Sequence, residues 1–171
     1  MNPRLALAIV GTVFGLSASA QAAVTDATAA RRGANWLSGQ QITSVGQQAD
    51  TIVALAAVGT AKSTLRSRLS TLTPAAPAYA SGPGSAGKVV LAAVAAGVNP
   101  RTLGGVNYIA RIRGAYRNGW YGTSKYDQAY AILALRAAGE SVPIMAIRRV
   151  TGARGRGGWG YKLSTGVRDD A

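Results

Sequence analysis

Thr51-Ile-Val-Ala-Leu-Ala-Ala-Val-Gly59 is the first of three similar stretches that decide the fold of this chain. The second is Val89-Val-Leu-Ala-Ala-Val-Ala-Ala-Gly97, and the third is Ala131-Ile-Leu-Ala-Leu-Arg-Ala-Ala-Gly139. Each is rich in alanine, which has the highest helix propensity, and each ends in glycine, which readily adopts the left-handed conformation that terminates helices. The terminal glycines lie about 40 residues apart, and a period of that size predicts repeated helical units.

The three stretches carry almost no charge, so each predicted helix is apolar on every side. A helix of that kind has to be surrounded by other helices. We therefore expect these stretches to form an inner layer. An outer layer of four helices is expected over residues 29–41, 61–72, 99–113 and 143–151. Because no segment predicts a strand, the predicted fold class is all-α.

The segments between these helices have the composition of loops, with much glycine, proline and serine. Loops are predicted over residues 42–49, 73–87, 114–125 and 152–160. Asp50 and Asp127 stand just ahead of the first and third inner helices. A carboxylate at that position can accept hydrogen bonds from the free amides of the first helical turn, so we predict both residues as helix N-caps.

The N-terminal residues 1–22 have the pattern of a secretory signal peptide. Arg4 supplies a positive charge, residues 5–16 form an apolar core, and Ala18-Ser19-Ala20 or Ala20-Gln21-Ala22 offers the small residues of a cleavage site. We therefore expect an exported protein whose residues 23–171 form one domain. An uncleaved N-terminal membrane anchor is the alternative.

The composition excludes several classes of site. The chain contains no cysteine and no histidine, which removes Cys/His zinc sites, thiol nucleophiles and catalytic triads with an imidazole. We predict no catalytic, cofactor-binding or metal-binding residue. The net charge is +13, which favours anionic partners such as acidic cell-surface polymers or phospholipid head groups. The other interpretation is an ordinary basic surface, because the arginines are dispersed along the sequence.

Nucleic acid is not an expected partner. The Gly/Arg segment over residues 152–158 lacks the preceding strand and the Lys-Ser/Thr pair of a phosphate-binding loop. With Trp159 and Tyr161 beside it, the segment could stack on nucleobases or sugars, but a loop that locks the outer helices is the favoured interpretation. The ligand of the predicted module is therefore left open.

A second pattern joins each outer helix to a glycine-aromatic loop, in three copies of decreasing quality. An aromatic side chain on the helix can pack on an apolar neighbour, while glycine lets the loop backbone approach closely. We therefore predict that Trp36 and Trp159 are buried between helices. The residues of the pattern are Arg32, Gly33, Trp36, Leu37 and Gln41 in the first copy, Gly105, Tyr108, Gly119, Trp120 and Tyr121 in the second, and Gly157 and Trp159 in the third.

The pattern resembles the QW motif of the squalene cyclase and protein prenyltransferase superfamily, a basic residue-Gly-x2-aromatic-Leu-x3-Gln run followed by Gly-x-Trp. The first copy matches the leading half, but Gln48 stands in the place of the final tryptophan. The second has Arg113 in the glutamine position and Tyr121 in the tryptophan position, and the third keeps only its loop. The resemblance covers nearly all of the chain from Ala29 onward and implies a partial α/α-toroid, an arc of helical hairpins.

The chemistry of that superfamily does not carry over. Its cyclases use an Asp-x-Asp-Asp proton donor, whereas the nearest string here, Val167-Arg168-Asp169-Asp170, lacks the first aspartate. Its prenyltransferases bind zinc through Asp, Cys and His. We therefore predict an exported, non-catalytic helical repeat module with a binding or structural role. The alternatives are a fragment of a terpene-cyclase-like or prenyltransferase-like enzyme, and a cationic binder of anionic cell-surface polymers.

The C-terminal end suggests an incomplete ring. Aspartates precede two of the inner helices, and a similar Asp169-Asp170 pair is followed only by Ala171. The superfamily's ring takes about twice as many helices as the seven expected here. We therefore expect a toroid truncated at its C-terminus, or an arc completed by a partner. Its open edge would expose apolar surface and promote self-association.

Overall fold

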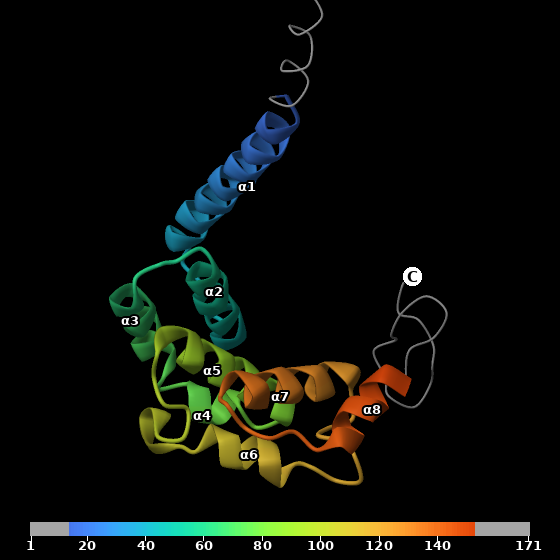
Figure 1. The fold of residues 1–171 in the computed structure, drawn as a ribbon. Coiled ribbons are helices and arrows are strands. Elements are labelled where there is room, and N and C mark those ends of the chain that lie inside the picture. The colour runs from blue at the N-terminus through green and yellow to red at the C-terminus, as the bar shows by residue number, and fades with distance from the viewer. Residues whose placement is uncertain (1–13, 153–171) are drawn as a thin grey trace, which may run out of the picture. The chain divides into compact units, whose positions relative to one another are not determined.

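The computed structural model describes residues 14–152 and confirms the all-α fold class, with no β-strand in this range. The backbone forms eight α-helices and one short 3-10 helix (Figure 1). The elements are α1 (Phe14–Ser38), α2 (Val45–Ala57), α3 (Lys62–Leu72), α4 (Ala76–Tyr79), α5 (Pro83–Ala96), η1 (Leu103–Gly105), α6 (Tyr108–Gly114), α7 (Lys125–Ala137) and α8 (Ile144–Gly152).

The chain divides into two compact units after Gln40. In the first unit the described part is α1, which contains most of the outer helix predicted over residues 29–41. Trp36 is 65% exposed, so no described residue of its own unit buries it, and its burial between helices stays a prediction. Arg32 and Gly33 are also exposed and Leu37 is half-buried, while Gln41 begins the second unit and is exposed.

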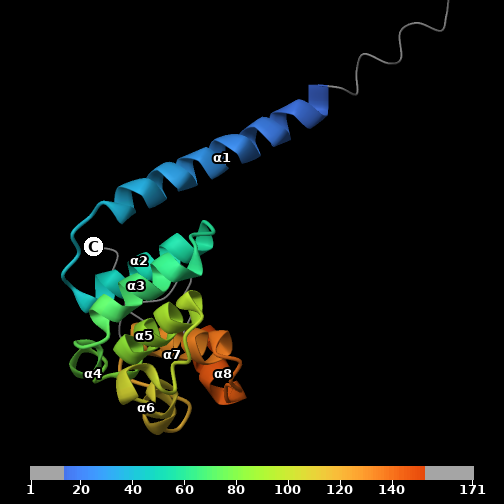
Figure 2. The same cartoon turned by 90° about the vertical axis from the view of Figure 1, so that its left-hand side faces the viewer.

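The second unit has the arrangement of a helical repeat. The predicted inner helices correspond to α2, α5 and α7, and α5 lies between the other two (Figures 1 and 2). α3, α6 and α8 each pack back on the inner helix that precedes them, which makes three consecutive hairpins. The short α4 packs on α2 and α5. No helix in the described part of the chain is both long and apolar enough to cross a bilayer.

The three inner helices end in the same way, as the repeated glycines predict. Gly59, Gly97 and Gly139 have φ angles of 81°, 69° and 74°, the left-handed conformation. In each case the next residue donates its amide to a carbonyl five residues earlier, as in Thr60 to Leu55 at 3.1 Å and Glu140 to Leu135 at 2.8 Å. The glycine itself donates its amide to the carbonyl three residues earlier. The two bonds together form the Schellman motif, which satisfies carbonyls left free at a helix C-terminus.

The central helix α5 is covered on nearly every side, as expected for an apolar inner helix. Its closest neighbour is α7, and glycine permits the approach. A Cβ atom added to Gly87 would lie 2.7 Å from the carbonyl oxygen of Tyr130. One added to Gly84 would lie 2.5 Å from a carboxylate oxygen of Asp127. Both contacts advance by three residues along both helices, so α5 and α7 run parallel.

Several predicted boundaries are wrong, for local reasons. α2 begins at Val45, inside the predicted loop over residues 42–49. The predicted loop over 73–87 contains α4 and the first turn of α5, which starts at a proline. In place of one outer helix over 99–113 there are η1 and α6, because Gly104 and Gly105 have positive φ angles that an α-helix cannot continue through.

Neither predicted N-cap caps its own helix. Asp50 lies within α2, which starts five residues earlier, and its carboxylate accepts a 2.7 Å hydrogen bond from Lys88 of α5. The N-cap of α7 is Ser124, whose hydroxyl accepts from the amide of Asp127 at 3.0 Å. The carboxylate of Asp127 instead accepts from the amide of Gly84 at 3.2 Å, so it satisfies a free N-terminal amide of the neighbouring helix α5.

Large apolar side chains remain exposed on α2, α7 and α8, and not on α5. Among the three inner helices, α2 and α7 therefore have more open faces than the central helix α5. The prediction that this surface promotes self-association stays a prediction. The side chains are Val53 on α2, Leu133 on α7, and Ile144, Met145 and Ile147 on α8, with exposed fractions from 37% to 59%.

Candidate binding pocket

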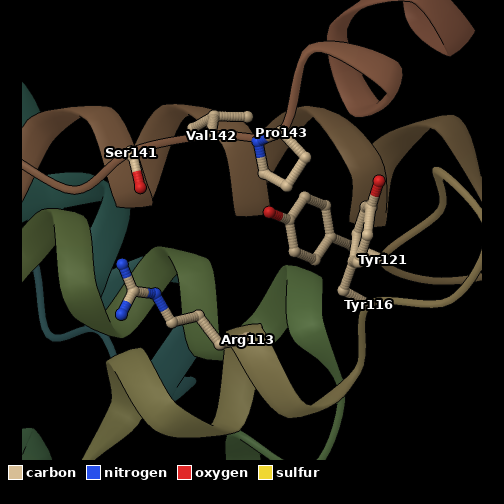
Figure 3. A pocket seen from close by; sticks show the side chains of 6 residues that line it. All are labelled: Arg113, Tyr116, Tyr121, Ser141, Val142 and Pro143. Carbon is tan, nitrogen blue, oxygen red and sulfur yellow. The ribbon is translucent and has the colours of Figure 1, made fainter.

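A pocket of about 380 Å³ opens between α6, the loop that follows it and the link from α7 to α8. Arg113 comes from α6, while two aromatic rings come from the loop (Figure 3). Its volume falls within the range of about 300–1,000 Å³ that small-molecule sites occupy. The lining residues are Arg113, Tyr116, Tyr121, Ser141, Val142 and Pro143.

The loop that carries the two tyrosines is shaped by a tight turn. The backbones of Arg117 and Trp120 exchange two hydrogen bonds of 2.7 and 2.9 Å. The two residues between them, Asn118 and Gly119, have φ angles of 50° and 93°. Positive φ at both central positions defines a type I′ turn, for which Asn-Gly is the preferred sequence. The Asn-Gly pair was therefore a usable signal that the sequence analysis missed.

Gln128 of α7 holds this loop against α8. The side chain is fully buried, and its oxygen accepts a 2.7 Å hydrogen bond from the amide of Tyr121. Its nitrogen donates to the carbonyl oxygens of Gly119 and Ala146, both at 2.9 Å. One side chain thus satisfies three backbone groups of two separate segments. The sequence analysis did not identify this residue.

A signal for Gln128 was present in the repeat itself. Gln48 in α2 stands at the same distance before Gly59 as Gln128 stands before Gly139. The side-chain amide of Gln48 also turns back to the preceding segment and donates to the carbonyl of Ile42 at 2.6 Å. A glutamine at the same register ahead of two of the repeated apolar stretches indicates a shared structural role.

An ion cluster closes one side of the pocket. Glu140 is held in place by the Schellman bond at the end of α7, and its side chain is 11% exposed. One carboxylate oxygen pairs with Arg101 and the other with Arg113, the latter at 2.5 Å. Two guanidinium groups therefore share one carboxylate, and the cluster keeps a net positive charge.

Two aromatic rings form the other side of the pocket. The rings of Tyr116 and Tyr121 lie 5.1 Å apart between centroids and are tilted by 52°. Burial raises the pKa of the Tyr121 phenol above its ordinary value, the neighbouring Tyr116 adds to this, and Arg113 lowers it in part. A phenol is protonated at neutral pH even at its ordinary pKa, so the hydroxyl of Tyr121 is a hydrogen-bond donor there.

Two further arginines lie close to this turn, Arg117 within the loop and Arg149 on α8. The guanidinium of Arg149 on α8 lies 5.4 Å from the ring centroid of Trp120, which is a cation–π contact. Arg117 donates to the carbonyl oxygens of Gly114 and Tyr116 at 2.9 and 2.6 Å. We refer to Arg101, Arg113, Arg117 and Arg149 as the arginine cluster.

A second group of polar and aromatic side chains lies at the start of the inner helices. Lys88 pairs with Asp50 and lies 5.4 and 5.2 Å from the ring centroids of Tyr126 and Tyr130. Burial alone would lower the pKa of Lys88, but hydrogen bonds to Asp50 and Tyr126 outweigh it and hold the pKa above its ordinary value. This fully partnered group joins α2, α5 and α7.

The residues of the glycine-aromatic pattern differ in burial, backbone conformation and contacts. Tyr108 is fully buried at the start of α6, Tyr121 is 2% exposed, and Trp120 is half-buried. Gly105 and Gly119 both have positive φ angles, but a Cβ atom would meet a close neighbour only at Gly119, where it would lie 3.1 Å from Cγ of Arg149. Arg113, in the glutamine position of the motif, makes an ion pair rather than a helix-end cap. Gly157, Trp159 and residues 167–170 lie outside the described range.

Within residues 41–152, all three carboxylates hold other groups of the protein. Asp50 binds Lys88, Asp127 binds Ser124 and the amide of Gly84, and Glu140 binds two arginines. Within residues 14–152, no three or more Asp, Glu, His or Cys side chains come together as a metal site would require.

No known family model, curated protein or solved structure matches this chain. The resemblance to squalene cyclases and prenyltransferases therefore stays a prediction. The helical-repeat arrangement rests on the hairpins and on their repeated helix ends. The functional argument accordingly depends on the pocket and its surroundings.

Proposed function

We propose that this chain is a non-catalytic helical-repeat module that binds an anionic polymer through the arginine cluster. The observation that carries the proposal is the charge balance of the described part of the second unit. Residues 41–152 contain twelve Lys and Arg side chains but only three Asp and Glu. Since all three carboxylates are already held by groups of the protein, they leave most of the basic charge uncompensated.

Many of the basic side chains are fixed in place without losing their charge. Lys62 and Arg66 of α3 donate to the carbonyl oxygens of Ala95 and Ala96 at the end of α5. Arg111 donates to the carbonyl oxygens of Pro77 and Ala80. A carbonyl is neutral, so a cation bound to it still attracts anions. A cation already held in one geometry also loses less entropy when it binds a ligand.

The same observations argue against the alternative of an enzyme fragment. A general acid of the cyclase type needs a carboxylic acid whose proton is available to the substrate. In the second unit, Asp50, Asp127 and Glu140 are committed to hydrogen bonds or ion pairs inside the protein. A binding role therefore accounts for the arrangement better than catalysis does.

Further parts of the proposal come from the sequence. The three hairpins are compatible with an arc of an α/α-toroid, in which parallel inner helices line one layer. The pattern in residues 1–22 supports export, and an exported basic module would meet acidic cell-surface polymers.

Binding to anionic polymers is tested with the full chain and immobilised polygalacturonate, with a neutral glucan as control. We expect retention on the acidic polymer that weakens steeply as salt rises, because contacts with a polyanion release bound counterions. Retention that does not change with salt, or equal retention on the neutral glucan, would contradict the proposal. Thermal melting at each salt concentration shows whether the protein itself stays folded.

Export is tested by mass spectrometry of the protein recovered from culture medium and from membranes of the producing cell. The small residues at Ala18–Ala22 predict a mature N-terminus near Gln21 or Ala23. Recovery of chains that begin at Met1 in the membrane fraction would favour the N-terminal anchor. Recovery of such chains in the cytosolic fraction alone would reject both.

A further inference from the structure

We infer that the pocket beside Arg113 binds one acidic sugar unit, a pyranose that carries a carboxylate, within the anionic polymer. This inference rests on the proposed function and names its ligand. Its support is the combination of an unbalanced cation, two aromatic rings and three hydroxyl groups around one opening of about 380 Å³. Each of the three matches one feature of such a sugar.

The charge of the pocket fits one carboxylate. Arg101 and Arg113 share the carboxylate of Glu140, so these three side chains together have one positive charge in excess. The side chain of Arg113 is 47% exposed and lines the pocket, and its ion pair with Glu140 is made by one terminal nitrogen. A guanidinium has further N–H groups in the same plane, which suits recognition of a planar carboxylate.

The walls fit a sugar ring. One face of a pyranose carries C–H groups, which pack on the electron-rich face of an aromatic ring. Tyr116 and Tyr121 are tilted by 52°, so they form an angled wall rather than a parallel slot for a flat base. Val142 and Pro143 supply further apolar contact across the opening (Figure 3).

The hydroxyl groups fit the polar edge of a sugar. Tyr116, Tyr121 and Ser141 line the pocket, and each carries a hydroxyl group. A hydroxyl both donates and accepts, as the sugar hydroxyls do.

The test measures binding of small probes to the full chain by nuclear magnetic resonance titration. The probes are methyl galacturonate glycoside with a free carboxylate, methyl galactoside, inorganic phosphate and a short single-stranded DNA. We expect saturable shifts with the acidic sugar and at least tenfold weaker binding of the neutral sugar. Equal binding of phosphate would show a plain anion site, and tighter binding of the DNA would show a nucleic-acid surface; either result overturns the inference.

Three variants distinguish binding in the pocket from attraction by the overall positive charge of the protein. Arg113→Gln should weaken binding of the acidic sugar about tenfold, as expected for loss of a charge-assisted hydrogen bond. Tyr116→Leu keeps the charge and should weaken both sugars by a similar factor. Arg68→Gln removes the same charge from α3, which does not line the pocket, and should leave sugar binding unchanged.

The outcomes distinguish this inference from the proposed function. If immobilised polygalacturonate retains the protein but Arg113→Gln binds the acidic sugar as tightly as the unchanged protein, the pocket assignment is wrong and the polymer-binding function stands. If immobilised polygalacturonate does not retain the protein, the proposed function fails and the inference fails with it. Thermal melting of each variant shows that the loss of binding does not come from unfolding.

Discussion

Replacing Gln128 with leucine should lower the free energy of unfolding by about 3–5 kcal/mol, because three buried backbone groups lose their partner together. The affected groups are the amide of Tyr121 and the carbonyls of Gly119 and Ala146. Leucine has a similar size, so the cost comes from unmade hydrogen bonds rather than from a cavity. Urea denaturation of both proteins, followed by circular dichroism, measures the difference.

Two further substitutions sharpen this test. Gln128→Glu keeps an acceptor for the amide of Tyr121 but places a carboxylate against two carbonyl oxygens, so it should also be strongly destabilising. Gln47→Leu changes an exposed glutamine of α2 and should alter stability by less than about 0.5 kcal/mol. If Gln128→Leu unfolds at the same urea concentration as the unchanged protein, the three bonds do not hold the loop as described.

Gly87→Ala should destabilise the second unit by about 1–3 kcal/mol, although alanine is the better helix former by about 1 kcal/mol. The new Cβ atom would lie 2.7 Å from the carbonyl oxygen of Tyr130 and 2.9 Å from its carbonyl carbon. These are backbone atoms of α7, which cannot move aside as a flexible side chain can. The two helices would have to separate along their closely packed contact.

The matched control is Gly114→Ala at the end of α6, where an added Cβ would meet no atom within 4 Å. Here the propensity of alanine acts alone, so stability should stay equal or rise slightly. A rise in the melting temperature of Gly87→Ala, similar to that of the control, would show that α5 and α7 are less tightly packed than the structure indicates.

The repeated helix ends could be predicted from the sequence because the signal is local. Glycine in the left-handed conformation terminates a helix whatever packs around it. The predictions for Gly59, Gly97 and Gly139 are therefore confirmed at all three positions. The apolar character of α5 likewise predicted a helix covered by others, since burial follows from composition.

The predictions that failed depended on what lies beside each residue. A local rule assigned Asp50 and Asp127 to their own helices, but their carboxylates bind Lys88 and the amide of Gly84 across helix boundaries. Propensity and spacing describe a helix, and they do not describe its neighbours.

The amino-acid sequence by itself determined the all-α class, the repeat and its glycine helix ends, because each depends on residues that are close together in the chain. Only the tertiary structure decided the pocket, the shared pairing of Glu140 and the three hydrogen bonds of Gln128. The pocket joins α6, its loop and the α7–α8 link, segments that are separated in sequence. Packing brings them together, since their side chains and backbone groups satisfy one another only in the folded chain.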